Sequence, residues 1–268
     1  MTNLEAKKSL GQNFLTNPKV PEWMADAGKV KKGSVVLEIG PGTGMLTREL
    51  LARGAQVVAI EADPRAMEIL HETFPEAIKN RKLLLIHGDI REMTAEDIPV
   101  SPHEYTLVAN IPYYLSGHLF RFFLSGNIQP KTLVFLVQKE VAVRIARDEK
   151  ESLLSLSVKA FGTPQYIKTI SKGNFRPQPK VDSAIIAVTD ISHDNFRKLP
   201  EPFFFKILHL GLSAKRKMLL GSLAKEYDRD TLKEIFTKLD IPLTVRGEDL
   251  PVNRWFTLIQ TLYTTFKQ

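Results

Sequence analysis

The sequence predicts an α/β fold in which helices cover both faces of a mainly parallel sheet, followed by a small all-helical C-terminal domain. The first observation is that short apolar runs alternate with segments of helical length between residues 34 and 148. Parallel strands joined by crossover helices produce this alternation. The second is a pair of apolar runs, at 165–170 and 184–189, with no helical segment between them, which indicates an antiparallel hairpin. The third is that every periodic segment from residue 202 onward has helical spacing.

The elements follow a regular order along the chain. Residues 7–15 precede any strong periodic pattern and are expected to form an N-terminal arm, and residues 18–27 are expected to form the first helix. Prolines and glycines mark most of the later breaks. Strands are then expected at 35–39, 57–60, 83–86, 106–109 and 132–137, and helices at 45–53, 64–73, 116–124, 139–148, 202–213, 215–226, 229–238 and 251–265.

Length and composition are those of a globular protein with one large domain and a smaller one. The chain has 268 residues, of which 43% are hydrophobic and 25% charged. It contains no cysteine, which excludes disulfides, thiolate metal ligands and a thiol nucleophile. No apolar stretch has membrane-spanning length and the N-terminus lacks a signal-peptide pattern, so a cytoplasmic location is expected. Because residues 190–200 are polar and end in proline, we expect residues 1–195 to hold the arm and the α/β domain and 196–268 the helical domain.

The net charge of +7 is unevenly distributed. Residues 33–190 hold 18 basic and 18 acidic side chains, whereas residues 1–32 hold six against three and residues 191–268 hold thirteen against nine. The excess therefore lies outside the central segment, as a polyanionic partner held by flanking elements would require. The alternative is that these charges only keep the protein in solution.

A glycine-rich turn follows the first expected strand. Gly40, Gly42 and Gly44 alternate with other residues directly after an apolar run, and Glu61 ends the next run, 21 residues after Gly40. An acid at the tip of the second strand of a nucleotide-binding unit accepts hydrogen bonds from ribose hydroxyls. The spacing is not the dinucleotide fingerprint, so a nucleoside cofactor without phosphate is favoured, and S-adenosylmethionine is the common one. The alternative is a structural strand–helix corner.

Two further strand ends carry candidate site residues. Asp89 follows the third strand, where its carboxylate can accept the amino group of an adenine, or can act as a turn or helix-cap residue. Asn110, Ile111, Pro112 and Tyr113 follow the fourth. The Asn110 side chain and the Ile111 backbone carbonyl can accept the two hydrogens of a planar amino group and draw its lone pair toward a methyl donor. Proline fixes the backbone and the tyrosine ring offers a flat face to the base, although an ordinary strand-end turn is the alternative.

Phe175 lies in a proline-rich segment between the last two strands. A ring on a rigid loop suits stacking on a base extruded from its helix, and Arg176 and Lys180 beside it can hold phosphates. The alternative is a phenylalanine buried for packing. Farther on, Lys215, Arg216 and Lys217 are expected to begin a helix, where three consecutive cations cannot share one face, so some meet solvent or a phosphate backbone. The histidines show no ligand spacing, and no metal is proposed.

Five motifs occur in order along the chain. They are Lys-Lys-Ser-Leu-Gly-Gln-Asn-Phe-Leu (7–15), Glu-Ile-Gly-Pro-Gly-Thr-Gly (38–44), Asn-Ile-Pro-Tyr (110–113), Val-Gln-Lys-Glu-Val-Ala (137–142) and Phe-Arg-Pro-Gln-Pro-Lys-Val-Asp-Ser (175–183). Together they resemble the ribosomal RNA adenine N6,N6-dimethyltransferases, above all the bacterial small-subunit enzymes of the KsgA/RsmA type, over essentially the whole chain. Ile111 and Tyr114 depart from the family's more frequent leucine and asparagine.

The resemblance implies a Rossmann-like class I S-adenosylmethionine-dependent methyltransferase with a small helical C-terminal domain that recognises RNA. It implies dimethylation of two adjacent adenines in the 3′-terminal hairpin of small-subunit (16S) ribosomal RNA, within a partly assembled 30S particle. The sequence leaves the oligomeric state open, and a monomer is the default expectation. The cofactor contacts that it implies are Asn13 and Leu15 from the arm, then Gly40, Glu61, Asp89 and Asn110.

Two other functions remain open from the sequence. The erythromycin-resistance type methylates large-subunit (23S) RNA and shares the core motifs, but the long segment 177–183 and the basic segment 213–217 favour the small-subunit type. A non-catalytic ribosome assembly or transcription factor could keep the fold without the reaction. The presence of the whole set argues against that alternative: Glu61, Asp89, Asn110, Tyr113 and Phe175.

Overall fold

The computed structural model describes residues 4–7, 11–214 and 216–266, and the chain folds into two compact units. The first unit runs up to Val143 and includes Gly162–Ile191. The second consists of Arg144–Phe161 and the chain from Ser192 onward. The sequence placed the domain boundary between residues 195 and 196, and the last change of unit along the chain lies between Ile191 and Ser192. Residues 144–161 also belong to the unit of the C-terminal helices.

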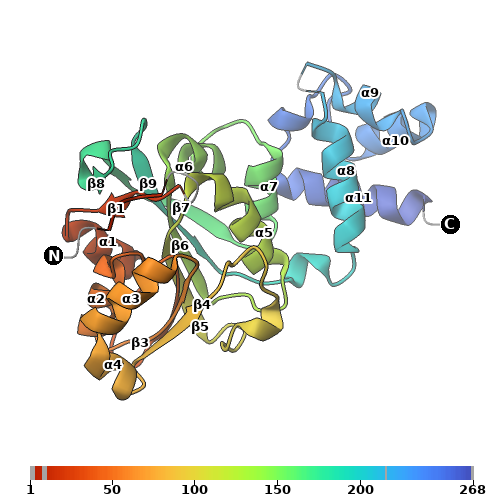
Figure 1. The fold of residues 1–268 in the computed structure, drawn as a ribbon. Coiled ribbons are helices and arrows are strands. Elements are labelled where there is room, and N and C mark those ends of the chain that lie inside the picture. The colour runs from red at the N-terminus through yellow and green to blue at the C-terminus, as the bar shows by residue number, and fades with distance from the viewer. Residues whose placement is uncertain (1–3, 8–10, 215, 267–268) are drawn as a thin grey trace. The chain divides into compact units, whose positions relative to one another are not determined.

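The first unit is built on a seven-stranded sheet with the order β4-β3-β2-β5-β6-β9-β7 (Figure 1). Neighbours among the first five of these strands run parallel, and β9 pairs antiparallel with both β6 and β7. The predicted parallel sheet with a closing antiparallel hairpin is confirmed. The strands are β2 (Val35–Ile39), β3 (Gln56–Glu61), β4 (Leu83–His87), β5 (Tyr105–Asn110), β6 (Thr132–Gln138), β7 (Thr163–Ile170) and β9 (Ser183–Thr189).

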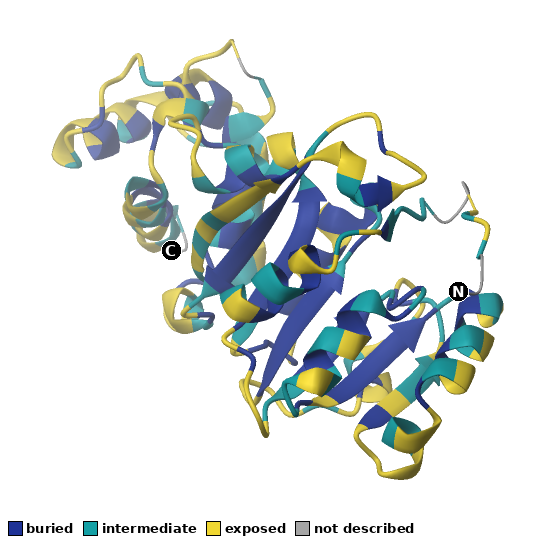
Figure 2. Cartoon of the chain, turned by 90° about the vertical axis from the view of Figure 1, so that its left-hand side faces the viewer, coloured by how far each residue is buried: buried dark blue, intermediate teal, exposed yellow. Residues whose placement is uncertain are grey.

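Both faces of the central strands are buried, which explains why these strands read as continuous apolar runs. Val36 and Val108 belong to the core cluster that includes Met24 and Leu50 from the helices, while Leu37, the residue after Val36 on β2, is also fully buried. Figure 2 shows these strands as buried and the outward sides of the helices as exposed. The helices of this unit are α1 (Lys19–Ala27), α2 (Met45–Ala52), α3 (Pro64–Thr73), α4 (Pro75–Lys79), α5 (Ser116–Ser125) and most of α6 (Lys139–Ala146).

The strand register brings the candidate residues to one edge of the sheet. Ile39 at the end of β2 is level with Ile60 of β3 and with Ala109 of β5. The next residues along the three strands are Gly40, Glu61 and Asn110. Three segments far apart in the sequence therefore meet at the carboxyl ends of adjacent parallel strands, where open α/β sheets bind ligands.

A second, two-stranded sheet ties the N-terminal arm to the segment after β7. The strands β1 (Phe14–Leu15) and β8 (Phe175–Arg176) pair antiparallel, with Leu15 opposite Phe175. The backbone amide of Thr16 also donates to the carbonyl of Asn174 at 2.9 Å. Strands of two residues leave no periodic trace in the sequence, so this pairing was not predicted.

The second unit is helical, with a core around the fully buried Trp255. A Cβ on Gly211 would lie 2.5 Å from the Trp255 ring, so glycine there allows close packing, and the indole nitrogen donates to the carbonyl of Gly247 at 3.2 Å. The helices are α7 (Leu153–Lys159), α8 (Glu201–Leu212), α9 (Leu219–Leu223), α10 (Arg229–Lys238) and α11 (Val252–Phe266). In the described part of the chain no helix combines the length and apolar character needed to cross a membrane.

The helix expected at 215–226 is wrong at both ends. Helix α9 runs only from Leu219 to Leu223, and the described residues between 213 and 218 are not helical. Met218 is extended and bridges Arg246, and the amide of Leu219 donates to the carbonyl of Val245 at 2.8 Å. Because this backbone pairs with a distant segment, it cannot form the helical hydrogen bonds that the local pattern favoured.

Candidate active site

A pocket opens at the carboxyl ends of β2, β3 and β5. Its lining combines the arm, the glycine turn, the loop after β4, the segment after β5 and β8. Of the residues expected to bind cofactor or act in catalysis, all but Gly44 line it. The predicted residues in the lining are Asn13, Leu15, Gly40, Gly42, Glu61, Asp89, Asn110, Ile111, Pro112, Tyr113 and Phe175.

The three glycines of the turn have different roles. All have positive φ, from +57° to +79°, which favours glycine. A Cβ on Gly40 would meet nothing within 4 Å, so open space lies directly over its backbone, whereas a Cβ on Gly42 would lie 3.0 Å from the ring of Phe14. At Gly44 it would lie 2.5 Å from Phe74, behind the turn. Gly44 is the N-cap of α2 and is not among the residues that line the pocket, so its contact with a cofactor stays a prediction.

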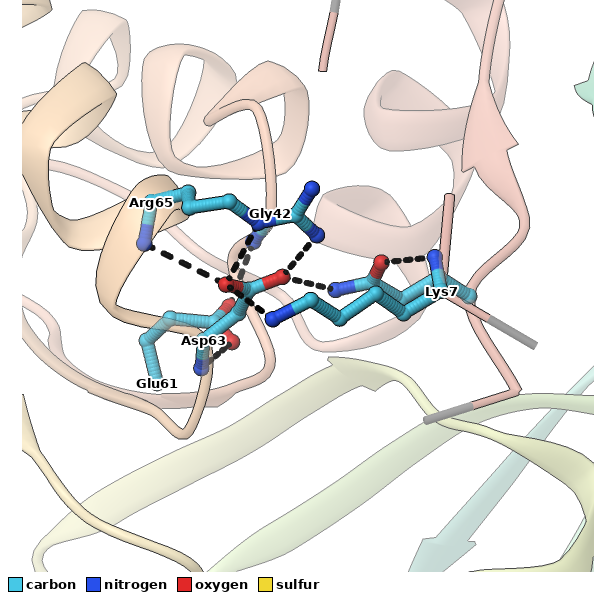
Figure 3. A network of polar contacts seen from close by, with 6 residues as sticks. Lys7, Gly42, Glu61, Asp63 and Arg65 are labelled. Carbon is cyan, nitrogen blue, oxygen red and sulfur yellow. Dashed lines mark hydrogen bonds and ion pairs between the residues drawn. The ribbon is translucent and has the colours of Figure 1, made fainter. Parts of the chain in front are cut away.

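Glu61 is held rigidly at the end of β3. Its side chain is 5% exposed, and its two oxygens accept hydrogen bonds from the backbone amides of Gly42 at 2.9 Å and Asp63 at 2.8 Å (Figure 3). Burial raises the pKa of Glu61, and these amides act in the opposite direction. A carboxylate can accept about four hydrogen bonds. Glu61 thus retains acceptor capacity for hydroxyl groups of a ligand.

Glu38 is a pocket residue that the sequence reasoning missed. It is 1% exposed and accepts a hydrogen bond from the Thr47 hydroxyl at 2.8 Å. Burial raises its pKa to about 8, with a further contribution from the nearby charge of Glu61. A glutamate inside the apolar run Val-Val-Leu-Glu-Ile was the signal that could have identified it.

Asn110 is oriented by the arm. Its amide nitrogen donates to the backbone carbonyl of Asn13 at 3.2 Å, and the Asn13 side chain donates in turn to the carbonyl of Gly11 at 3.1 Å. The amide nitrogen of Asn110 is thus engaged by protein. The side-chain oxygen is then the group that Asn110 offers to a ligand in the pocket.

Tyr113 and Phe175 line the same pocket, although Tyr113 follows β5 and Phe175 lies between β7 and β9. The Tyr113 hydroxyl lies 2.8 Å from the Ser183 hydroxyl, which positions the ring. Phe175 is 5% exposed and belongs to β8. The expectation of a ring presented on a loop is therefore corrected, because pairing with β1 places Phe175 in the wall of the pocket.

Asp89 is a turn residue at the pocket, and its contact with an adenine stays a prediction. It lines the pocket and also accepts a hydrogen bond from the backbone amide of Arg91 at 2.9 Å, as a turn residue does. The Arg91 guanidinium, 3.0 Å from either oxygen through Nε, keeps the pKa of Asp89 below its ordinary value. Asp89 is therefore ionised at neutral pH and can accept hydrogen bonds.

The basic residues singled out in the sequence are exposed where they are described. Arg176 follows Phe175 at the pocket wall, and Lys180 lies in the loop before β9. Arg216 and Lys217 belong to the second unit, in the loop before α9, and Lys215 lies outside the described residues. Exposure leaves these cations accessible to phosphate groups.

Comparison with known proteins decides the family. The sequence model of the family described as ribosomal RNA adenine dimethylase matches residues 3–263. The chain belongs to this family. A curated relative, ribosomal RNA small subunit methyltransferase A of Dehalococcoides mccartyi, is 36% identical over 255 residues, which cover 94% of this chain and 87% of the relative. The predicted family and enzyme class, an adenine dimethyltransferase acting on ribosomal RNA, are confirmed.

Solved structures confirm the fold of the ribosomal RNA adenine dimethylases. A dimethyladenosine transferase from Plasmodium falciparum is 24% identical with a TM-score of 0.79, over 94% of this chain and 98% of that one. The 23S rRNA methyltransferase ErmE is 23% identical with a TM-score of 0.73, over 93% of this chain and 99% of that one. The predicted class I methyltransferase fold with helical C-terminal elements is thus confirmed.

Proposed function

We propose that this family member transfers methyl groups from S-adenosylmethionine to the N6 atoms of two adjacent adenines in the 3′-terminal hairpin of small-subunit ribosomal RNA. The substrate would be a partly assembled 30S particle. The observation that carries the proposal is the pocket itself, in which an oriented Asn110 meets two aromatic rings and a buried acid at the ends of three parallel strands. The name of the relative at 36% identity supports the small subunit as the source of the RNA.

The pocket fits S-adenosylmethionine at several points. The space over Gly40 would admit a ligand close to the backbone. Glu61 would accept hydrogen bonds from ribose hydroxyls, and Asp89 would accept the amino group of the cofactor's adenine. Asn13 and Leu15 would contact the cofactor from the arm. The group would supply an electrophilic methyl carbon on a sulfonium sulfur.

The residues after β5 would prepare the substrate nitrogen. The lone pair of the adenine amino group is delocalised into the ring, so the nitrogen is a weak nucleophile. The Asn110 side-chain oxygen and the Ile111 carbonyl would accept its two hydrogens, which localises the lone pair without a general base. Pro112 would fix that backbone, and Tyr113 and Phe175 would hold the flat base at the correct distance and angle.

RNA binding would involve both units. Arg176 and Lys180 would contact phosphates near the extruded base, and Lys215, Arg216 and Lys217 would contact other phosphates from the second unit. The excess of basic over acidic side chains in residues 191–268, thirteen against nine, supports a role of the second unit in RNA binding. We therefore propose that the helical C-terminal domain recognises the RNA and that a monomer acts on it.

A direct test is transfer of tritiated methyl groups to under-methylated small subunits, with large subunits and naked RNA as parallel substrates. We expect label in small-subunit RNA, followed by mass-spectrometric detection of dimethyladenine in its 3′-terminal hairpin. Label only in large-subunit RNA would assign the chain to the erythromycin-resistance type instead. The absence of label from every substrate would favour a non-catalytic assembly factor.

A further inference from the structure

A fully buried carboxylate, that of Asp63, lies beside the pocket without a role in the reaction described above. Its side chain is completely shielded from solvent. A buried carboxylate is costly unless several donors satisfy it. Asp63 precedes α3 and accepts a hydrogen bond from the backbone amide of Arg65 at 3.2 Å, as a helix cap does. The Arg65 guanidinium binds both oxygens, at 3.0 and 2.6 Å, and holds the pKa of Asp63 well below its usual range.

The remaining partners of Asp63 come from the N-terminal arm. The Gln12 side chain donates to one carboxylate oxygen at 3.1 Å, and the Lys7 ammonium lies 3.6 Å from the other (Figure 3). The Gln12 side-chain oxygen in turn accepts a hydrogen bond from the backbone amide of Lys7 at 2.8 Å. A helix cap requires none of these contacts, because Arg65 alone satisfies that function.

Asp63 also connects to the cofactor pocket. Its backbone amide donates to Glu61 at 2.8 Å, and the second oxygen of Glu61 accepts from the amide of Gly42. The arm residues that follow Gln12 line the pocket, and the Asn13 carbonyl orients Asn110. A continuous chain of hydrogen bonds therefore runs from the arm through Asp63 to Glu61 and the glycine turn.

We propose that Asp63 is a positioning residue that anchors the N-terminal arm across the cofactor pocket while its backbone fixes Glu61. The inference rests on the proposed function, because it assigns S-adenosylmethionine to that pocket. Opening of the arm would remove Asn13 and Leu15 from the pocket wall and free the amide of Asn110. Cofactor binding and the orientation of Asn110 thus depend on one carboxylate that touches neither ligand.

The test swaps the acid and the amide between Asp63 and Gln12. Gln12→Glu places a second carboxylate against Asp63, which should repel the arm and weaken S-adenosylmethionine binding about tenfold, because a charged hydrogen bond is lost. Asp63→Asn keeps the side-chain shape and the helix cap. The double variant Gln12→Glu/Asp63→Asn restores one acid and one amide in reversed positions, and we expect it to recover most of the affinity. Lys19→Gln, which removes an exposed ion pair with Glu22 on α1, is the matched control.

Two measurements distinguish a failure of this proposal from a failure of the proposed function. The first is the Kd of S-adenosylmethionine by calorimetry, and the second is amide hydrogen exchange of residues 11–16 in the unliganded protein, with thermal unfolding to verify folding. Faster exchange and weaker binding in Gln12→Glu, both reversed in the double variant, support the proposal. Unchanged exchange in Gln12→Glu, or weaker binding that the double variant fails to recover, overturns it. If the wild-type protein does not bind S-adenosylmethionine, the proposed function fails, and the exchange measurement still decides whether Asp63 anchors the arm.

Discussion

The side chain of Asn110 donates a hydrogen bond to the backbone carbonyl of Asn13 at 3.2 Å, across 97 residues of sequence. In the proposed mechanism this contact makes the arm part of the catalytic geometry, since a free carboxamide could turn its nitrogen toward the substrate and repel the amino hydrogens. The oxygen that would accept those hydrogens is therefore set by a segment that precedes the sheet.

Asn110→Ala should reduce turnover much more than RNA binding. Removal of one oriented acceptor of this kind costs on the order of 10²–10³ in kcat, while the phosphate contacts that dominate RNA affinity remain. Single-turnover methyl transfer and filter binding of the RNA measure the two quantities. Equal losses in both would assign Asn110 to RNA binding instead. Asn195→Ala, a change in the second unit, provides a control for loss of an asparagine side chain.

Glu61→Ala should weaken cofactor binding more than any other property. A hydrogen bond between a hydroxyl and a charged group contributes about 1.5–3 kcal/mol, so the Kd of S-adenosylmethionine should rise at least tenfold. Calorimetry measures the effect, with the exposed Glu68→Ala on α3 as the control. An unchanged Kd would remove Glu61 from the cofactor site.

The sheet and the residues at its edge could be predicted because they depend on local pattern. Apolar runs located the strands, and the proline after Asp63 gave the start of α3, which runs from Pro64 to Thr73 as expected. Parallel strands then bring Gly40, Glu61 and Asn110 to a common edge by register alone. These positions could therefore be predicted without knowledge of any side-chain contact.

Apart from Glu38, the features that were missed depend on pairing between distant segments. The β1–β8 sheet, which buries Phe175, has two residues per strand and no period to detect. The false first turn of the helix before Leu219 arises from a bridge between Met218 and Arg246. The contacts of Asp63 with Gln12 likewise cross 51 residues. Local propensity cannot report on partners that only the folded chain brings together.

Glu38 should make folding stability fall as the pH rises. Its pKa is raised by burial from 4.5 to about 8, so the folded protein retains a proton that the unfolded chain releases. This stability is fully present below pH 4.5 and is lost as the pH rises to about 8. Glu38→Gln, which keeps an acceptor for Thr47, should flatten the slope. The contribution that it removes is on the order of 5 kcal/mol between the two ends of this pH range. Urea unfolding at several pH values measures it, and a slope equal to that of wild type would show that Glu38 does not titrate in this range. The burial of Glu61 contributes a slope of the same sign, so some dependence should remain.

Gly40→Ala and Gly44→Ala should separate ligand binding from folding. Both residues have positive φ, where an L-residue costs about 1–2 kcal/mol. The added Cβ at Gly40 meets only open space, so we expect little further loss of stability but at least tenfold weaker cofactor binding, because the methyl group occupies the space over the turn. At Gly44 the Cβ would lie 2.5 Å from Phe74, which adds about 1–3 kcal/mol of overpacking and should lower the Tm more. Thermal unfolding and calorimetry on both variants make the comparison. Normal cofactor affinity in Gly40→Ala would show that the space over this glycine is not where the ligand binds.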